Sequence, residues 1–270
     1  MIMIGTSGFQ FDDWRGDVYP EKLRKTDMLA YYEKELGFNV LEVNYTYYTL
    51  PSPRTFDGML RKTSKDFSFV VRSHKDMTHD IWSGERRTEL KDTSDVFKKF
   101  LYGIKPLVDA GSLGCVLLQF PYYFYPVPAH YDYLLKCKDN LSALDVVVEF
   151  RNRRWAGQTT FDFLRKNELG FCIVDEPRLP GLVPLIPEVT SEIAYFRFHG
   201  RNPNWFNAEK SERYDYNYTD AELKEFIPMI HDIRNRTKKV YLFFNNCHKG
   251  QAAKNAAAMK NFIFDSKLMY

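Results

Sequence analysis

Eight short apolar runs, each rich in β-branched or aromatic residues, recur along the whole chain and constrain its fold more than any other sequence feature. Runs of this length and composition are typical of buried β-strands. They are IMIGT (2–6), NVLEVN (39–44), FSFVVR (67–72), CVLLQF (115–120), DVVVEF (145–150), FCIVD (171–175), IAYFRFH (193–199) and KVYLFFNN (239–246). We therefore expect a fold built on eight core strands.

Helical patterns separate most of these runs. Ser52 followed by Pro53 predicts a cap and first-turn proline, and Thr219 with Glu222 predicts a capping box. The proline-rich segment 176–192 predicts little helix. The helices predicted from apolar spacing and terminal glycines cover 28–37, 53–63, 94–109, 160–169, 219–236 and 251–265.

This alternation of strands and helices predicts the architecture. Parallel strands need a crossover connection, and helices usually supply it. Eight such units predict an α/β fold, a closed (β/α)8 TIM-like barrel of parallel strands, as a single domain over residues 1–270. An open, doubly wound sheet is the alternative, but Gly5-Thr6-Ser7-Gly8 does not match the glycine-rich turn G-x-G-x-x-G of that fold.

Composition excludes several classes of protein. The net charge is only +3, from 38 basic and 35 acidic residues, which does not by itself indicate nucleic-acid binding. The four cysteines, Cys115, Cys137, Cys172 and Cys247, form no C-x-x-C pair and are expected as reduced thiols. No secretory signal begins the chain and no run of about 18 apolar residues occurs, so we expect a cytoplasmic protein without a membrane partner.

Alternation along each strand predicts which side chains point into the barrel. In 193–199 the apolar face is Ala194, Phe196 and Phe198, so Arg197 and His199 point inward. Inward polar residues gather at the carboxyl ends of the strands, where barrel active sites lie. This polar set consists of Ser7, Glu42, Asn44, Arg72, His74, Gln119, Glu149, Arg151, Asp175, Arg197 and His199, with the last strand ambiguous between Asn245 and Asn246.

The chemistry of this set indicates an anionic ligand. Arginine binds phosphate or carboxylate groups in a bidentate manner, and Arg72, Arg151 and Arg197 are all predicted to point inward. Glu149 or Glu42 is a candidate general base and His199 a candidate acid or base, with Asp175 as a further catalytic candidate. The rival explanation is mutual pairing, because three arginines face three carboxylates.

Aromatic residues fall in the predicted loops after the strands. Trp14, Trp82, Trp155 and Trp205 all lie there, as do Tyr122 to Tyr125 and the aromatics of 200–220. Aromatic rims suit stacking on sugars or bases, and Trp14 and Trp155 are predicted substrate contacts. The alternative is that long loops bury their own aromatics as small satellite cores.

Eight motifs in order resemble the signature blocks of the YecE-like family, also catalogued as domain of unknown function 72. They are GTSGFQFDDWRGDVYP, LEVNYTYYTLPSP, the histidine of MTHD, LLQFPYYF, VVVEFRNRRW, VDEP, FRFHG and FFNN, and they span residues 2 to about 250. The resemblance implies a TIM-like barrel and a bacterial cytoplasmic protein, without an established activity. It adds Gly8, His79, Pro121 and Gly200 to the site residues, whereas Asn152 stands where relatives often have histidine.

Four hypotheses for function follow. The first is a hydrolase-like enzyme acting on a small phosphate- or carboxylate-bearing substrate, including nucleic-acid-derived ones. The second is a divalent-metal phosphodiesterase or sugar enzyme with His74, Glu149, Asp175 and His199 as ligands, although inward arginines oppose a cation and no metal is assigned. A glycosidase is disfavoured, because the fourth and seventh strands end in Gln119 and His199 rather than carboxylates.

The fourth hypothesis is a non-catalytic nucleic-acid-binding protein. Its basic loop residues would be Arg86, Arg87, Lys91, Arg153, Arg154, Arg201, Lys210 and Arg213. Interspersed acids such as Glu85 and Glu89 weaken this hypothesis. The sequence identifies no cofactor.

Overall fold

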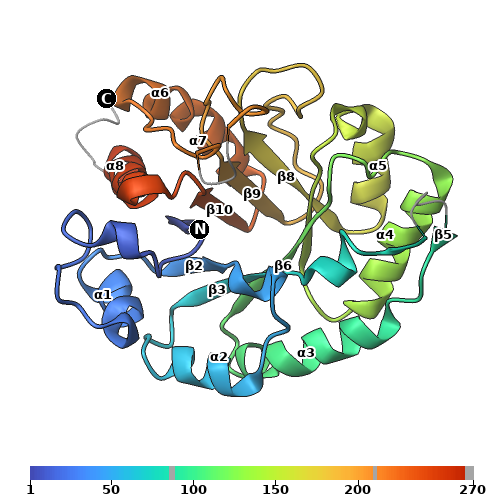
Figure 1. The fold of residues 1–270 in the computed structure, drawn as a ribbon. Helices are drawn as coiled ribbons and strands as arrows, with labels where there is room; N and C mark the ends of the chain where they lie inside the picture. The colour runs from blue at the N-terminus through green and yellow to red at the C-terminus, as the bar shows by residue number, and fades with distance from the viewer. Residues whose placement is uncertain (85–88, 209–211, 265–270) are drawn as a thin grey trace.

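All eight expected strands are present in a computed structural model of the chain, which describes residues 1–84, 89–208 and 212–264 (Figure 1). The strands form one parallel sheet in the order β1-β10-β9-β8-β7-β6-β3-β2. They are β1 (Ile2–Thr6), β2 (Val40–Val43), β3 (Ser68–Arg72), β6 (Leu113–Gln119), β7 (Val146–Glu149), β8 (Leu169–Asp175), β9 (Ile193–Phe198) and β10 (Lys239–Phe244). The fold is therefore the predicted α/β TIM-like barrel.

The seam between β1 and β2 closes the barrel by an unusual connection. The two strands share a single bridge, at Ser7 and Glu42, beside which the Gly8 N–H donates to the Glu42 carbonyl at 2.9 Å. Further along the seam, the Tyr32 hydroxyl accepts from the Thr6 N–H at 2.9 Å and donates to the Val40 carbonyl at 3.1 Å. A helix side chain thus replaces the ladder hydrogen bonds that strand pairing would otherwise supply.

Helices cover the outside of the sheet (Figure 1). They are α1 (Met28–Lys34), α2 (Pro53–Leu60), α3 (Ser94–Asp109), α4 (Pro128–Asn140), α5 (Gln158–Lys166), α6 (Asp220–Glu225), α7 (Ile227–Asn235) and α8 (Gln251–Phe264). The Thr219–Glu222 capping box is present, but the helix predicted over 219–236 is divided at Phe226, just before Pro228. The helix predicted over 251–265 is described as far as Phe264, and Asp265 lies outside the described residues.

The connections from β6 to β7 and from β8 to β9 differ from each other. The first holds helix α4, which was not predicted because its sequence has a weak apolar stripe. The second is the proline-rich link, which holds no α-helix, as predicted. Short elements occupy the loops: the antiparallel pair β4 (Trp82–Ser83) and β5 (Glu89–Leu90), and, within the described residues, six 3-10 turns. These turns are η1 (Asp12–Trp14), η2 (Lys25–Asp27), η3 (Tyr45–Tyr47), η4 (Lys75–Met77), η5 (Arg153–Trp155) and η6 (His248–Gly250).

The strand register divides the barrel interior into two zones. Tyr195 lies beside Tyr241 and Cys172 in the first half of the strands, and all three are buried. Toward the carboxyl ends, Arg197 lies beside Phe243 and Val174, and Gln119 lies beside Glu149. The apolar zone fills the barrel along the first half of the strands. The polar side chains predicted to point inward therefore lie together near the carboxyl ends of the strands, at the mouth of the barrel.

Candidate functional site

A chain of ion pairs crosses the barrel just below its mouth. Arg197 donates from Nη2 to Glu42 Oε1 at 2.7 Å and from Nη1 to Glu149 Oε2 at 2.5 Å. Arg151 Nε lies 2.6 Å from Glu149 Oε1, and its Nη1 lies 3.4 Å from Glu176 Oε2. We call Glu42, Arg197, Glu149, Arg151 and Glu176 the buried ion network. It joins β2, β7 and β9 across the lumen, so the pairing that the sequence offered as a rival explanation accounts for most of these charges.

Both glutamates at the centre of the network are paired with guanidinium groups, although Glu149 Oε1 has no hydrogen-bond partner among the described residues. The Tyr195 hydroxyl donates to the second oxygen of Glu42 at 2.5 Å. Burial alone would raise the pKa of Glu149, but Arg151, Arg197 and His199 hold it well below its ordinary value. Glu149 is therefore ionised at every physiological pH and serves as the anchor of two guanidinium groups.

His199 is a neutral imidazole at the edge of the network. Its side chain is fully buried, and burial together with Arg151 lowers its pKa to about 3. Nδ1 lies 3.0 Å from Asn245 Nδ2, and because the amide nitrogen donates, the proton lies on Nε2. Nε2 in turn lies 3.3 Å from Glu149 Oε1. Asn245, rather than Asn246, is thus the asparagine of the last strand that faces the barrel.

Arg72 stands outside the ion network. Its Nη2 donates to Gln119 Oε1 at 2.5 Å, and its guanidinium lies 4.1 Å from the centre of the Tyr47 ring. Within the part of the chain that the structure describes, no carboxylate lies within ion-pair distance of Arg72, and its Nε has no hydrogen-bond partner. Burial and the nearby Arg197 lower the pKa of Arg72. Arg72 therefore has no direct carboxylate partner among the described residues, and Glu149 and Glu42 act on its charge only from a distance.

Arg72 lines the larger of the two pockets described at the mouth. This pocket has a volume of 560 Å³. Two atoms of its wall, Ser7 Oγ and Asn44 Oδ1, are buried without a hydrogen-bond partner among the described residues. The lining consists of Ser7, Phe11, Asp13, Asn44, Tyr47, Tyr48, Arg72, Arg213, Tyr214, Asn245, Cys247 and His248. A concave site with a few unsatisfied polar groups is the usual form of a small-molecule site.

A smaller pocket of 260 Å³ adjoins it on the far side of Tyr214. Arg213 and Tyr214 line both pockets, and Tyr214 packs edge-on against Trp205 with ring centres 5.2 Å apart. The remaining lining residues are His79, Gln119, Pro121, Tyr122, Arg151, Leu182, Trp205 and Phe206. Of the aromatic rim that the sequence predicts, Tyr122, Trp205, Phe206 and Tyr214 line this pocket.

One predicted inward residue points the other way. Asp175 is in register with Phe198 of β9, on the face that packs against the helices. There its carboxylate accepts from Arg201 Nε and Nη2, both at 3.0 Å, and from the Tyr218 hydroxyl at 2.6 Å. The orientation inferred for Asp175 was wrong because a run of five residues, FCIVD, fits either face, and the neighbouring strand decides between them.

Two residues that matter at the mouth were missed or underrated. Glu176 follows Asp175 and shares the inward face with Val174, so the correct alternation would have identified it. Its Oε1 accepts from the Val183 N–H at 2.9 Å, and burial raises its pKa to about 7 despite Arg151. His79, assigned only through the family resemblance, lines the smaller pocket, where burial and Arg72 lower its pKa to about 4.

Glu42, Glu149, Arg197 and His199 line neither pocket, and four other predicted site residues also lie outside both. Trp14 and Trp155 are fully buried in loop cores, with indole N–H groups donating to the carbonyls of Cys247 and Phe124 at 2.7 and 2.6 Å. His74 accepts from the Asp76 N–H and so caps the turn η4. Asn246 donates to Asn255 Oδ1 and the Tyr216 carbonyl, each at 2.8 Å. These side chains shape the loops around the mouth.

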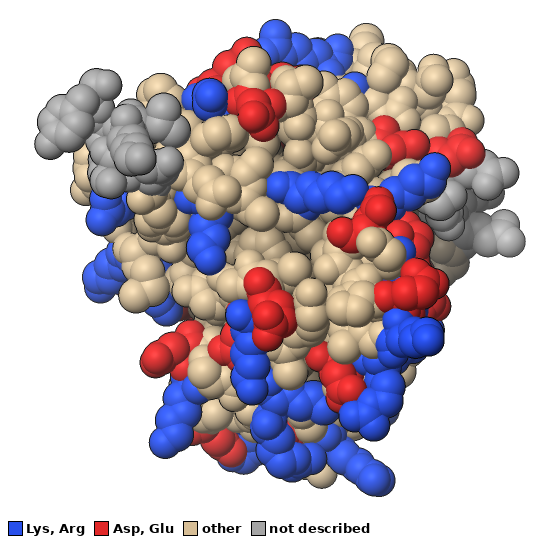
Figure 2. All heavy atoms as spheres, turned by 90° about the vertical axis from the view of Figure 1, so that its left-hand side faces the viewer, with Lys and Arg blue, Asp and Glu red and all other residues tan. Residues whose placement is uncertain are grey.

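The metal and nucleic-acid hypotheses find little support in this arrangement. The His74 side chain caps a turn and the Asp175 side chain faces the helices, and no cluster of three potential ligands occurs among the described residues. Of the basic loop residues, Arg201 is paired with Asp175 and Glu222, while Arg86, Arg87 and Lys210 lie outside the described residues. Lys and Arg are interspersed with Asp and Glu on the face seen in Figure 2. None of the described helices is long and apolar enough to cross a membrane.

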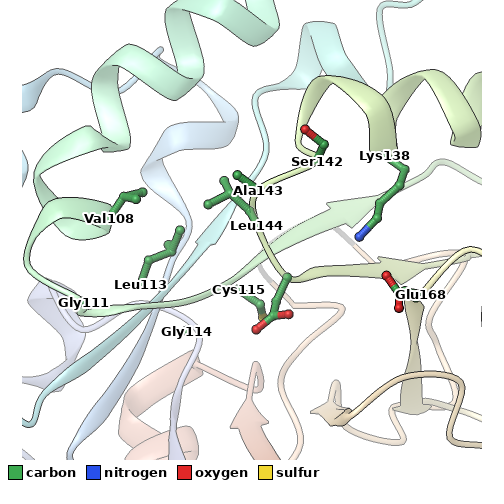
Figure 3. A pocket seen from close by; sticks show the side chains of 11 residues that line it. Val108, Gly111, Leu113, Gly114, Cys115, Lys138, Ser142, Ala143, Leu144 and Glu168 are labelled. Atoms are coloured by element: carbon green, nitrogen blue, oxygen red, sulfur yellow. The ribbon is translucent and has the colours of Figure 1, made fainter.

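A third pocket, of 370 Å³, lies at the opposite end of the barrel (Figure 3). Leu113 begins β6 there, and Lys138 of α4 and Glu168, which precedes β8, line it from other elements. Active sites of such barrels lie at the carboxyl ends of the strands, whereas this pocket lies at the amino ends. It provides a natural control site for ligand-binding experiments.

Comparison with known proteins finds relatives over nearly the full chain. A family model described as "Protein of unknown function DUF72" matches residues 3–267. The UPF0759 protein YunF of Bacillus subtilis (strain 168) is 29% identical over 277 residues, which cover 97% of this chain and 95% of that protein.

Solved structures extend the comparison to three dimensions. A DUF72 family protein of Thermotoga maritima is 44% identical, with a TM-score of 0.90 over 97% of this chain and 99% of that one. A DUF72 family protein of Enterococcus faecalis is 26% identical, with a TM-score of 0.84 over 100% and 97% of the two chains. The similarity therefore includes the strands and loops that form the mouth.

Proposed function

The chain belongs to the DUF72 family of proteins of unknown function, and on that premise we propose that it is an enzyme that binds a small phosphate- or carboxylate-bearing substrate at the barrel mouth. The observation that carries the proposal is Arg72. A partly buried guanidinium that lacks a carboxylate partner among the described residues is costly to maintain unless a ligand compensates its charge.

The wall around Arg72 supports the same class of ligand. Ser7 and Asn44 present buried polar atoms that find no partner within the described residues, and Asn245 lines the same pocket. The Ser7 hydroxyl and the amide nitrogens of Asn44 and Asn245 can donate to phosphate or carboxylate oxygens without adding charge, whereas the buried Asn44 Oδ1 can only accept, for example from a substrate hydroxyl. Arg72 would supply the charge-assisted hydrogen bonds that fix the orientation of the anion.

We propose hydrolysis-type chemistry, in which protons move to and from water at the mouth. In this scheme Glu149, Glu42 and His199 are positioning residues, because all three are buried. Glu149 stays ionised, His199 stays neutral, and Glu42 is paired with Arg197. His79 is neutral near pH 7 and lines the smaller pocket. A bound anion beside His79 would raise its pKa, so that it could accept a proton during the reaction.

Binding of inorganic phosphate, measured by isothermal titration calorimetry, tests the anion site. We expect Arg72→Met to weaken phosphate binding about tenfold or more, since hydrogen bonds to charged groups contribute about 1.5–3 kcal/mol. The variant should unfold in urea at the same concentration as the unsubstituted protein or a higher one, because it removes a buried charge that has no direct carboxylate partner.

Lys138→Met, in the pocket at the opposite end, is the matched control and should bind phosphate normally. If Arg72→Met binds phosphate as tightly as the unsubstituted protein, the anion site is misplaced. The same conclusion holds if Lys138→Met alone loses binding.

A further inference from the structure

The two pockets at the mouth have a common wall. Arg213 and Tyr214 line both, whereas Arg72 lines only the larger and Arg151 only the smaller. Tyr214 is held in place from two sides, with its ring centre 5.2 Å from that of Trp205 and 5.9 Å from that of His199. The mouth is thus one depression divided by a tyrosine.

Two guanidinium groups also line the smaller pocket. Its described lining residues include Arg213 and Arg151, the latter paired with Glu149 and Glu176, and contain no aspartate or glutamate. Arg213 donates to the Trp205 carbonyl at 2.8 Å and lies over the Trp205 ring, and no carboxylate among the described residues pairs with it. Among the described residues, Asp13 is the one acid that lines the larger pocket, and it accepts a hydrogen bond from the Lys249 N–H.

Tyr214 lines the pocket of Arg72 on one side and the pocket of Arg151 on the other. An anion in either pocket would be attracted by the guanidinium group that lines it. The geometry therefore provides two positions for negative groups, one on each side of the ring.

Building on the anion-binding function proposed above, we infer that the substrate carries two anionic groups, one held at Arg72 and the other at Arg151 and Arg213, on opposite sides of Tyr214. Arg213, which lines both pockets, would contact the part of the substrate that passes the tyrosine. Tyr214 would then select substrates by the spacing of their two negative groups.

Calorimetric binding of methylphosphonate and of α,ω-diphosphonates with one to four methylene groups tests this inference. We expect one spacer length to bind about tenfold more tightly than methylphosphonate, because a second charge-assisted contact is added. Phe206 lines only the smaller pocket and is 56% exposed. Phe206→Glu should abolish the advantage of the diphosphonate and leave methylphosphonate binding nearly unchanged, with Phe206→Gln as the neutral control.

Tyr48→Glu is the matched variant in the larger pocket, where Tyr48 is 73% exposed. It should weaken methylphosphonate and diphosphonates alike. If methylphosphonate binds but no diphosphonate binds more tightly, or Phe206→Glu weakens both ligands equally, the two-anion inference is wrong and the single anion site stands. If neither ligand binds, the proposed function itself fails.

Discussion

Glu176 is the residue at the mouth whose charge changes near neutral pH. Its pKa is about 7 in the folded chain, against an ordinary value of 4.5. Between these pH values the folded state keeps a proton that the unfolded state has lost. Raising the pH through this range therefore weakens the folded state. The shift of the Glu176 pKa corresponds to a loss of about 3 kcal/mol in the free energy of unfolding once the carboxyl is ionised.

Glu176→Gln should remove this pH dependence. The amide keeps an acceptor for the Val183 N–H but cannot ionise. We expect the free energy of unfolding of the variant, relative to the unsubstituted protein, to rise by about 3 kcal/mol between pH 5 and pH 8, measured by urea unfolding. The effects of His79 and His199 on the free energy of unfolding are the same in both proteins, so they cancel in the difference between the variant and the unsubstituted protein. The exposed Glu192→Gln controls for loss of one negative charge, and parallel pH profiles for Glu176→Gln and the unsubstituted protein would contradict the assignment.

At the scale of elements, the β1–β2 seam depends on one side chain of α1. The Tyr32 hydroxyl bonds to the Thr6 N–H and the Val40 carbonyl, and a Cβ at Gly5 would lie 2.2 Å from that carbonyl. Only glycine at position 5 lets the two strands approach closely enough for this bridge. The seam therefore couples helix packing to closure of the barrel.

Tyr32→Phe should lower the free energy of unfolding by about 1–3 kcal/mol, because it leaves two buried backbone groups unsatisfied. Urea unfolding measures the loss, and hydrogen exchange at the Thr6 amide should speed up more than elsewhere in the barrel. Tyr31→Phe, on the same helix, is the control. Equal stability of the two variants would show that the hydroxyl does not hold the seam.

The elements themselves could largely be predicted from the sequence. All eight strands were, because apolar runs of five to eight residues bounded by turn residues have few other structures available. Helix α4 could not, since PAHYDYLLKCKDN has no clear apolar stripe. The seam was also beyond prediction, because no pattern in the chain indicates that Tyr32 reaches between two strands.

At the scale of the whole molecule, the mouth is a set of charges that nearly cancel. Three carboxylates and two arginines form the buried ion network, and Arg72 is left over. Buried ion pairs add little net stability, so we propose that the network fixes the geometry around Arg72. The alternation of side chains along each strand predicted that polar groups point into the barrel. Which of these groups pair depends on distances between strands across the barrel, and the sequence of a strand does not contain these distances.

The most direct test of the central claim is a crystal structure of the protein soaked in tungstate, a tetrahedral and electron-dense analogue of phosphate. We predict a tungstate ion in the 560 Å³ pocket, bonded to Arg72 and to Asn44 or Asn245. Anomalous scattering would locate it without ambiguity. Tungstate bound only beside Lys138 at the opposite end of the barrel, with none near Arg72, would contradict the account.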